Sequence, residues 1–224
     1  MTTTARARAN TDTVHAQLRA ELLAGIYAPG ERLKFTPLCE RYDASVSVVR
    51  EALTRLAEQG LVVSEPNIGF RVMPLTVADL RDLTRTRIDI ETLALRYAIE
   101  QGGVEWESDL VAAHHRLERT AMTTDTGGPE RLADEWERAH AAFHAALIAG
   151  CDSPRLVCMT VGLRDASELY RRWSQPREPG RDVAGEHRRL MEAALARDTD
   201  AAVEALTAHY QHTTDILEAG LRAQ

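Results

Sequence analysis

The spacing of apolar residues in the N-terminal part of the chain predicts three helices. Val14, Leu18 and Leu22 recur every fourth residue, which places them on one face of a helix. Gly25 ends that helix, because glycine is a poor helix former. Thr36 is the expected N-cap of the next helix, since its hydroxyl can accept from a free backbone N–H. The predicted helical ranges are 12–25, 37–42 and 46–59.

Two short apolar runs follow, separated by turn residues. Residues 61–63 and 70–72 predict two strands, and residues 66–69 (PNIG) predict the turn between them. The order helix, helix, turn, helix, two-stranded hairpin describes a winged helix-turn-helix over residues 11–75, behind a flexible tail at 1–10. The major groove of DNA is about 12 Å wide and admits one α-helix, so the third helix of such a unit can read base edges.

From Thr76 onward no strand pattern is visible, and the chain predicts helices alone. Glycine and proline clusters, such as Gly102-Gly103, mark the breaks between them. We therefore expect a mainly α protein whose second domain, 76–224, is an antiparallel bundle of six to seven helices. The predicted segments are 76–101, 105–121, 129–149, 154–174, 181–197 and 199–220.

The composition, with 44% hydrophobic and 27% charged residues, is that of an ordinary globular protein. No apolar run approaches the ~20 residues of a membrane helix, and the N-terminus lacks the apolar core of a secretory signal. We therefore expect a cytoplasmic protein with no membrane partner. The three cysteines are odd in number and form no C-x-x-C pair, which argues against a disulfide framework or zinc finger and favours buried thiols.

The net charge of −7 is unusual for a DNA-binding protein, but it is unevenly distributed. Residues 1–75 carry nine basic and eight acidic side chains, whereas the rest of the chain carries 18 and 26. The acidity thus belongs to the C-terminal domain, and the basic footprint of the N-terminal domain is modest. The cations available there for phosphates are Arg32, Lys34, Arg41, Arg50 and Arg55.

Three runs in the N-terminal domain resemble the GntR family of bacterial transcription regulators. Residues 25–33 (GIYAPGERL) resemble the entry to the family's second helix, and residues 44–53 (ASVSVVREAL) resemble its DNA-reading helix. Residues 69–72 (GFRV) resemble the wing. The resemblance implies a homodimer that binds a short palindromic operator in double-stranded DNA.

The same resemblance assigns DNA contacts to single residues. Ser45, Ser47 and Arg50 match the family positions that contact phosphates and bases, and an arginine can fork onto a phosphate or a guanine edge. Arg32 and Gly69 match contacts to the DNA backbone. The full set of expected DNA contacts is Arg32, Ser45, Ser47, Arg50, Arg55 and Gly69.

Two features of the reader helix complicate this assignment. Val46 stands where the family has an arginine, so we expect a change in the bases read or weaker phosphate anchoring. Arg50 and Arg55 could instead form salt bridges with Glu51 and Glu58 on a solvated helix. The complete winged pattern favours DNA contact over that alternative.

Histidines in the C-terminal domain are candidate metal ligands. His140 and His144 are four residues apart, so they project from one face of a helix. Neutral imidazole is a good ligand for zinc or nickel, yet a single histidine on a helix is more often a surface or core residue. Sequence spacing alone cannot bring His187 and His209 to this pair.

The C-terminal domain resembles the FCD-type ligand-binding domain of FadR-like regulators. Residues 142–147 (AFHAAL) and 186–190 (EHRRL) carry most of the resemblance. Many such domains bind a divalent metal through one Asp and three His, and the metal helps to hold a small carboxylate effector. The family histidines fall on His144, His187 and His209, and the family Asp falls on His140.

The histidine at the position of the family aspartate leaves two interpretations open. Either His140 coordinates and the metal has four imidazoles, or three histidines bind it with an added water or effector oxygen. Four neutral ligands would leave the metal at +2 where an aspartate leaves +1, which favours anionic effectors and zinc- or nickel-like ions. His212 lies one turn from His209 and could substitute for it.

Arg87 matches a family arginine that faces the effector pocket, and its planar fork suits a carboxylate. The alternative is an exposed pair with Glu91, four residues further on. Trp136, Tyr170 and Trp173 are expected to be core or dimer contacts without chemistry of their own.

The two resemblances together imply a transcription regulator, with repression the favoured direction, whose effector shifts the placement of two DNA-binding units. One alternative is an architectural DNA-binding protein with a purely structural metal. The other is a metal-dependent enzyme that acts on a small acid, but no candidate general base lies at a sequence spacing from the histidines that is typical of a catalytic motif.

Overall fold

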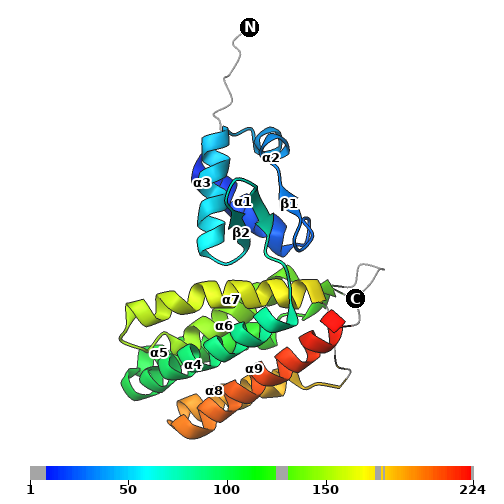
Figure 1. The fold of residues 1–224 in the computed structure, drawn as a ribbon. Helices are drawn as coiled ribbons and strands as arrows, with labels where there is room; N and C mark the ends of the chain where they lie inside the picture. Colours follow the sequence, from blue (N-terminus) through cyan, green and yellow to red (C-terminus); the bar gives the residue numbers. More distant parts are fainter. Residues whose placement is uncertain (1–8, 125–130, 175–177, 179, 223–224) are drawn as a thin grey trace. The chain divides into compact units, whose positions relative to one another are not determined.

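The computed structural model describes residues 9–124, 131–174, 178 and 180–222. The chain divides into two compact units, Met1–Leu75 and Thr76–Gln224 (Figure 1). Most of the tail predicted at 1–10 lies outside the described residues. Asn10 caps the first helix, because its side chain accepts a hydrogen bond from the backbone N–H of Thr13.

Three helices and a small sheet make up the first unit. The antiparallel sheet has the strand order β1-β3-β2. The predicted winged helix-turn-helix at the N-terminus of a mainly helical chain is confirmed. The elements are α1 (Thr11–Leu23), β1 (Arg32–Leu33), α2 (Phe35–Tyr42), α3 (Val46–Glu58), β2 (Val62–Glu65) and β3 (Gly69–Val72).

Two local predictions in this unit were wrong. The wing hairpin is extended to three strands, because β1 pairs with β3; a strand of two residues is too short to show a period in the sequence. The second helix begins at Phe35 with Lys34 at its N-cap position, and Thr36 lies inside the helix. Pro37 is then the third helical residue, where a missing N–H costs no intrahelical hydrogen bond.

The apolar face of α1 packs against α3 to form the core of the first unit. Leu18 and Leu22, one turn apart on α1, and Leu53 on α3 are fully buried. Val46 and Arg50 are exposed on α3. The helix therefore has one face that holds it in the unit and another that is free to enter a groove.

Six helices and a small hairpin make up the second unit within the described residues. The helices are α4 (Val77–Gln101), α5 (Val104–Glu118), α6 (Asp134–Ile148), α7 (Pro154–Ser174), α8 (Val183–Leu195) and α9 (Thr199–Arg222). In the bundle, α4 packs against α6, α7 and α9, and α8 packs against α5 and α9 (Figure 1). Its core includes the fully buried side chains of Leu95, Leu110 and Phe143.

The prediction that no strand follows Thr76 was wrong. Strands β4 (Thr123–Thr124) and β5 (Arg131–Leu132) pair antiparallel between α5 and α6. Each has only two residues, so neither shows a strand period. The helix predicted from residue 129 begins at Asp134, and residues 129 and 130 lie outside the described part of the chain.

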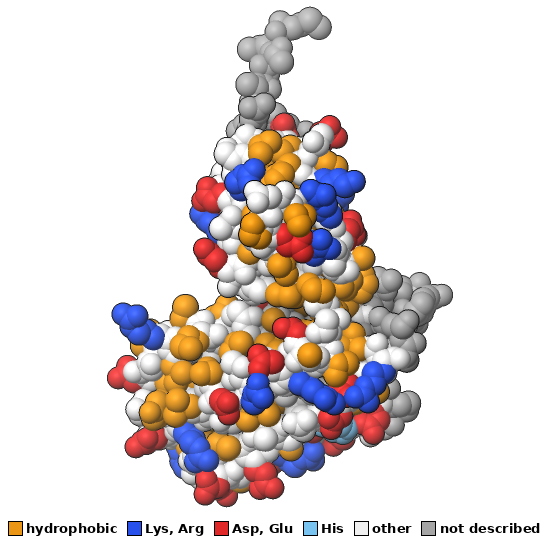
Figure 2. Space-filling model, viewed as in Figure 1, with side chains coloured by type: hydrophobic (Ala, Val, Ile, Leu, Met, Phe, Trp, Pro, Cys, Tyr) orange, Lys and Arg blue, Asp and Glu red, His pale blue; other side chains and the backbone are white. Residues whose placement is uncertain are grey.

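The structure describes the surface charges, the helix lengths and the burial of the cysteines, and it corrects the expectation for the cysteines. Acidic and basic side chains are interspersed on the face drawn in Figure 2. In the described part of the chain, no helix combines the length and the apolar character needed to cross a bilayer. The cysteines are not all buried thiols, since Cys151 is buried whereas Cys39 is half-buried and Cys158 is exposed.

Glu21, on α1, forms hydrogen bonds with two residues of α2. Its carboxylate accepts hydrogen bonds from Arg41 Nε at 2.9 Å and from the Tyr42 hydroxyl at 2.7 Å. Burial alone would raise the pKa of Glu21, but the hydrogen bonds from Arg41 and Tyr42 outweigh burial and lower it. These contacts help to fix the angle between α1 and the helix-turn-helix.

We expect Glu21→Gln to destabilise the first unit by about 1 kcal/mol near neutral pH, allowing for solvent screening of the pair. Because the pKa of Glu21 is lowered in the folded state, its contribution is present above the unfolded value of about 4.3 and is lost as the pH falls through the folded value. Calorimetric unfolding of wild type and variant should therefore converge in acid. Glu58→Gln, at an exposed position on α3, is the control. A difference independent of pH would contradict this role.

Candidate functional site

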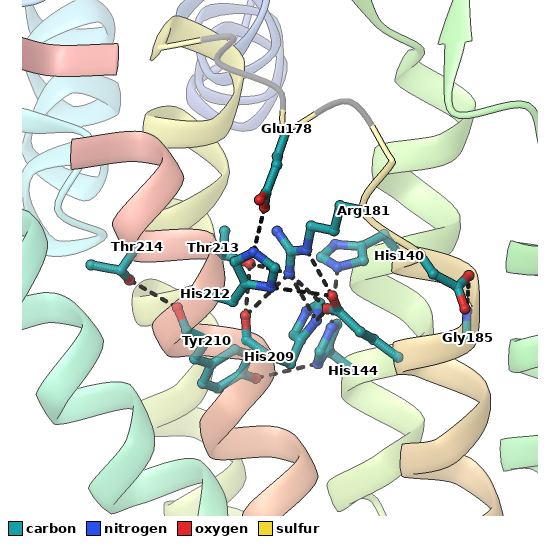
Figure 3. Close-up of polar contacts among 12 residues, drawn as sticks. His140, His144, Glu178, Arg181, Gly185, His209, Tyr210, His212, Thr213 and Thr214 are labelled. Atoms are coloured by element: carbon teal, nitrogen blue, oxygen red, sulfur yellow. Dashed lines mark hydrogen bonds and ion pairs between the residues drawn. The ribbon is translucent and has the colours of Figure 1, made fainter. Parts of the chain in front are cut away.

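Four histidines from three helices meet inside the second unit. His140 and His144 come from α6, His187 from α8 and His209 from α9. Each offers one ring nitrogen, and these nitrogens all lie within 4.8 Å of one another. All four side chains are buried, and Figure 3 shows His140, His144 and His209 directed toward one another. The fold thus brings His187 and His209 to the pair on α6, which sequence spacing could not do.

The geometry of the cluster fits a bound metal ion. His140 Nε2 and His144 Nε2 are 3.1 Å apart, close to the ~3.3 Å between two imidazole nitrogens that share a tetrahedral zinc ion. His187 Nε2 is buried without a hydrogen-bond partner, and so is His140 Nδ1. A buried polar atom without a partner is costly, and a metal ion at the centre would satisfy a nitrogen directed to it.

Burial sets the charge state of the cluster. Removal from water lowers the pKa of His140, His144 and His187 well below the usual range, and the neighbouring histidines lower each pKa further. Burial also lowers the pKa of His209, against the opposing effect of Glu186. The four rings are therefore neutral at neutral pH, which is the form that donates a lone pair to a metal.

Outer hydrogen bonds orient two of the rings. The Tyr210 hydroxyl donates to Glu91 at 2.7 Å, so its oxygen can accept from His144 Nδ1 at 3.2 Å. Glu186 accepts from His209 Nδ1 at 2.6 Å. Both contacts place the ring proton on Nδ1 and leave Nε2 as the acceptor, the arrangement that metal-binding histidines use.

Glu186 is itself held by Arg181, whose guanidinium lies between α8 and α9. Arg181 Nη2 donates to Glu186 at 2.7 Å and to Thr213 Oγ1 at 2.9 Å (Figure 3). Burial opposes ionisation of Glu186, but the hydrogen bonds from Arg181 and His209 outweigh burial and lower its pKa. The carboxylate that orients His209 is therefore ionised.

Two buried ion pairs lie beside the histidines. Arg87 Nε donates to Glu91 at 2.8 Å, and the Arg87 guanidinium lies over the ring of Tyr210, 3.9 Å from its centroid. Arg171 donates to Glu137 at 2.9 Å. Arg87 does pair with Glu91, which was the alternative to a contact with the effector. The pair is buried, however, whereas that alternative expected it to be exposed.

A cavity of about 150 Å³ adjoins the cluster. Arg87, Arg171 and Arg181 line it together with His140 and His209. Sequence reasoning singled out only Arg87 among these arginines. It also missed Glu137 and Tyr210, although Glu137 precedes His140 by one helical turn and Tyr210 follows His209 directly. Trp136 is part of the buried core, as expected, and it also lines the cavity and stacks on His140 with ring centroids 4.7 Å apart.

The remaining candidate histidines lie outside the cluster. His212 is partly exposed and pairs with Glu178 at 2.5 Å, so it does not replace His209. His114, on α5, is buried against Phe143 and is not a member of the cluster.

In the first unit, the residues expected to contact DNA have different surroundings. The Ser45 hydroxyl caps α3 by accepting a hydrogen bond from the Val48 N–H. The Ser47 hydroxyl oxygen lies 2.9 Å from the Ser45 hydroxyl oxygen. The Arg50 guanidinium lies 4.6 Å from the centroid of Phe35. No carboxylate pairs with Arg50 within the described residues, so it is available to a ligand.

The other three candidates are already engaged or lie on the wing. Arg55 pairs with Asp12 at 2.7 Å and with Glu51 at 2.8 Å. The pair with Glu51 matches the alternative in which Arg55 forms a salt bridge on its own helix. Arg32 donates to the carbonyl of Ile68, which places it beside the wing turn. Gly69 has a φ of 116°, a conformation that favours glycine, so the wing turn requires it.

Two family models match the chain. Residues 10–72 match the model described as bacterial regulatory proteins of the gntR family, and residues 82–212 match the FCD domain. The first match covers the winged unit, and the second covers all four histidines.

Curated relatives match over nearly the whole chain. The HTH-type transcriptional regulator BphR of Paraburkholderia xenovorans is 36% identical over 95% of this chain and 87% of its own. The HTH-type transcriptional repressor GlaR of Escherichia coli is 34% identical over 86% of this chain and 88% of its own. Both are named as regulators of transcription and neither as an enzyme.

Solved structures share the fold. McbR/YncC of E. coli superposes with a TM-score of 0.74, covering 93% of this chain and 97% of its own at 23% identity. A structure described as the metal-free FCD domain of TM0439 superposes with a TM-score of 0.51, covering 67% of this chain and 99% of its own at 16% identity.

We expect purified full-length protein to contain about one divalent metal ion per chain, as a closed set of imidazole ligands implies. Strong chelators should lower the Tm of the second unit, because they leave neutral imidazoles buried without partners. His144→Ala and His187→Ala should each abolish stoichiometric metal, as measured by elemental analysis.

His212→Ala is the matched control, since His212 lies one turn from His209 but outside the cluster. Its metal content should equal that of wild type. Wild-type protein that is free of metal and unaffected by added zinc or nickel would contradict the metal centre.

Proposed function

Because the chain belongs to the GntR family of bacterial transcription regulators and carries an FCD domain, we propose that it is a repressor controlled by a small carboxylate. It would bind a palindromic operator as a homodimer and hold the effector at a metal ion in the FCD domain. The observation that carries this proposal is the buried cluster of four histidines beside an arginine-lined cavity.

The exposed face of α3 supports the role in DNA binding. Arg50 is exposed on the reader helix, free of carboxylate partners among the described residues, and can fork onto a guanine or a phosphate. Val46 is 50% exposed at the start of the same helix, at the position where the resemblance to the GntR family implies an arginine. We therefore propose that this chain reads a different base from its relatives at that position.

The ligand set supports zinc or nickel as the metal. His140, His144, His187 and His209 would hold it, and four imidazoles suit these borderline ions better than magnesium or calcium. The bound ion would supply a Lewis-acidic positive charge to which an effector oxygen can bind.

The charge balance of the interior supports an anionic effector. Glu91, Glu137 and Glu186 each pair with an arginine, so these carboxylates are already neutralised. Four neutral imidazoles would leave the metal with its full +2 charge. A buried charge is costly unless it is paired, and a carboxylate in the cavity would supply the counter-charge.

A chain of contacts links the cavity to the junction between the units. Arg171 lines the cavity, and Tyr170, the residue before it on α7, accepts a hydrogen bond from the Thr76 N–H at 3.2 Å. The same hydroxyl donates to Asp79 at 2.7 Å. Thr76 caps α4 directly after the first unit ends at Leu75. A shift of α7 on effector binding would therefore reach the start of α4.

The named relatives decide against the enzyme alternative, since they are regulators of transcription. The architectural alternative makes a different prediction from ours, because it has no effector. Chelation would then lower the Tm, while no carboxylate would alter DNA affinity.

We expect Arg50→Ala to weaken binding to a duplex selected from a randomised library by about 1–3 kcal/mol, because one base or phosphate contact is lost. Fluorescence anisotropy at fixed salt measures the affinity. Thr54→Ala, exposed one turn away on α3, should bind as wild type. Equal affinity of Arg50→Ala and wild type would remove Arg50 from the interface.

We expect at least one carboxylate from a panel of acetate, lactate, glutarate, benzoate and phenylacetate to raise the Tm of metal-loaded protein and to lower its affinity for the selected duplex. Tyr170→Phe should retain the Tm shift and lose most of the change in DNA affinity, because it cuts the link to Thr76 and Asp79. Tyr97→Phe, on an exposed face of α4, is the control. A carboxylate that binds without altering DNA affinity in wild type would favour the architectural alternative.

A further inference from the structure

The cavity beside the four histidines is lined by side chains of two chemical kinds. The polar lining, called here the arginine and histidine wall, consists of Arg87, Arg171, Arg181, His140 and His209 with Glu178, Tyr210 and Thr213. The apolar lining, called here the apolar wall, consists of Met122, Leu132, Trp136, Val183, Ile216 and Leu217. A ligand that contacts both linings needs an anionic end for the arginines and an apolar body for the apolar wall.

The apolar wall has the exposure expected of a binding surface. Met122, Leu132, Val183 and Ile216 are only half-buried, whereas core residues of the same bundle such as Leu95 are fully buried. The half-buried side chains therefore have apolar surface that the described residues leave uncovered. A ligand with an apolar body would cover it and gain the corresponding hydrophobic free energy.

The size of the cavity sets the size of that body. Its volume of about 150 Å³ equals that of an engineered apolar cavity known to bind benzene. Trp136 adds an aromatic wall next to the histidines, because its ring stacks on His140 at an interplanar angle of 13°. A phenyl-sized group fits both the volume and the aromatic lining.

The same wall disfavours short, fully polar acids. A second carboxylate or a hydroxyl directed at Leu132, Ile216 or Leu217 would lose its hydration and find no donor or acceptor among these side chains. A single carboxylate can instead use the arginine and histidine wall and leave the rest of the ligand apolar.

We infer that the effector of this cavity is a monocarboxylate with a phenyl-sized apolar body, whose carboxylate faces the histidine cluster and whose body packs on the apolar wall. This inference rests on the proposed function, since it specifies the effector of that metal site. It assigns specificity to Leu132, Ile216 and Trp136, and the cluster sets only the requirement for an anion.

Calorimetric titration of metal-loaded full-length protein tests the inference with ligand pairs that differ only in the body. Phenylacetate should bind at least about tenfold more tightly than acetate, because a phenyl group is buried. The affinity of 3-phenyllactate should exceed that of lactate by a similar factor. Glutarate, which places a second carboxylate where the phenyl ring would lie, should bind no better than acetate.

Ile216→Asn should remove most of the advantage of phenylacetate over acetate while leaving metal content and acetate binding unchanged. Val111→Asn, an equally apolar and partly exposed position on α5 away from the cavity, is the matched control. The milder Leu132→Ala repeats the test if Ile216→Asn unfolds. Quenching of Trp fluorescence by phenylacetate, lost in Trp136→Leu, gives an independent readout.

Two negative outcomes are distinguishable. Metal-dependent binding of lactate or glutarate, with phenylacetate and 3-phenyllactate no tighter than their short partners, would overturn the inference and leave the proposed function intact. Failure of every carboxylate to bind metal-loaded protein would overturn the proposed function and, with it, this inference.

Discussion

Burial of four imidazoles around one interior point is the constraint on which the second unit depends. Removal from water keeps the rings neutral, and neutral rings present lone pairs that need a partner. Glu186 and Tyr210 fix the orientation of two rings, and the pairs of arginine with glutamate cancel the nearby charges. The bundle thus leaves a centre at which the proposed metal ion would supply the missing partner, and an anion in the adjoining cavity would balance the charge of that ion.

Much of the fold was readable from the sequence because long helices repeat their apolar pattern over several turns. The boundaries of α3, α4 and α7 differ from their predicted ranges by at most one residue. Strands of two residues left no pattern to read, so β1 and the hairpin of β4 and β5 were missed. The start of α2 was misplaced because Thr36 and Pro37 form a good capping signal that the tertiary structure overrides.

The site was predictable only as far as local spacing and family resemblance reach. The pair of His140 and His144 followed from helical spacing, and resemblance supplied His187 and His209. No local sequence pattern marked Arg171 and Arg181 as residues of the cavity, because their position beside the histidines depends on how α7, α8 and α9 pack. Trp136 belongs to the buried core, as expected, but its second role as cavity lining depends on the same packing and left no signal in the sequence.

The central claim is that His140 has joined three histidines as a fourth imidazole at a metal ion. X-ray absorption spectroscopy of the metal in purified protein, compared with His140→Asp, tests it most directly. We expect four imidazole ligands at about 2.0–2.1 Å in wild type and three in the variant. The same imidazole count in both proteins, or a metal with no imidazole ligands, would contradict the account.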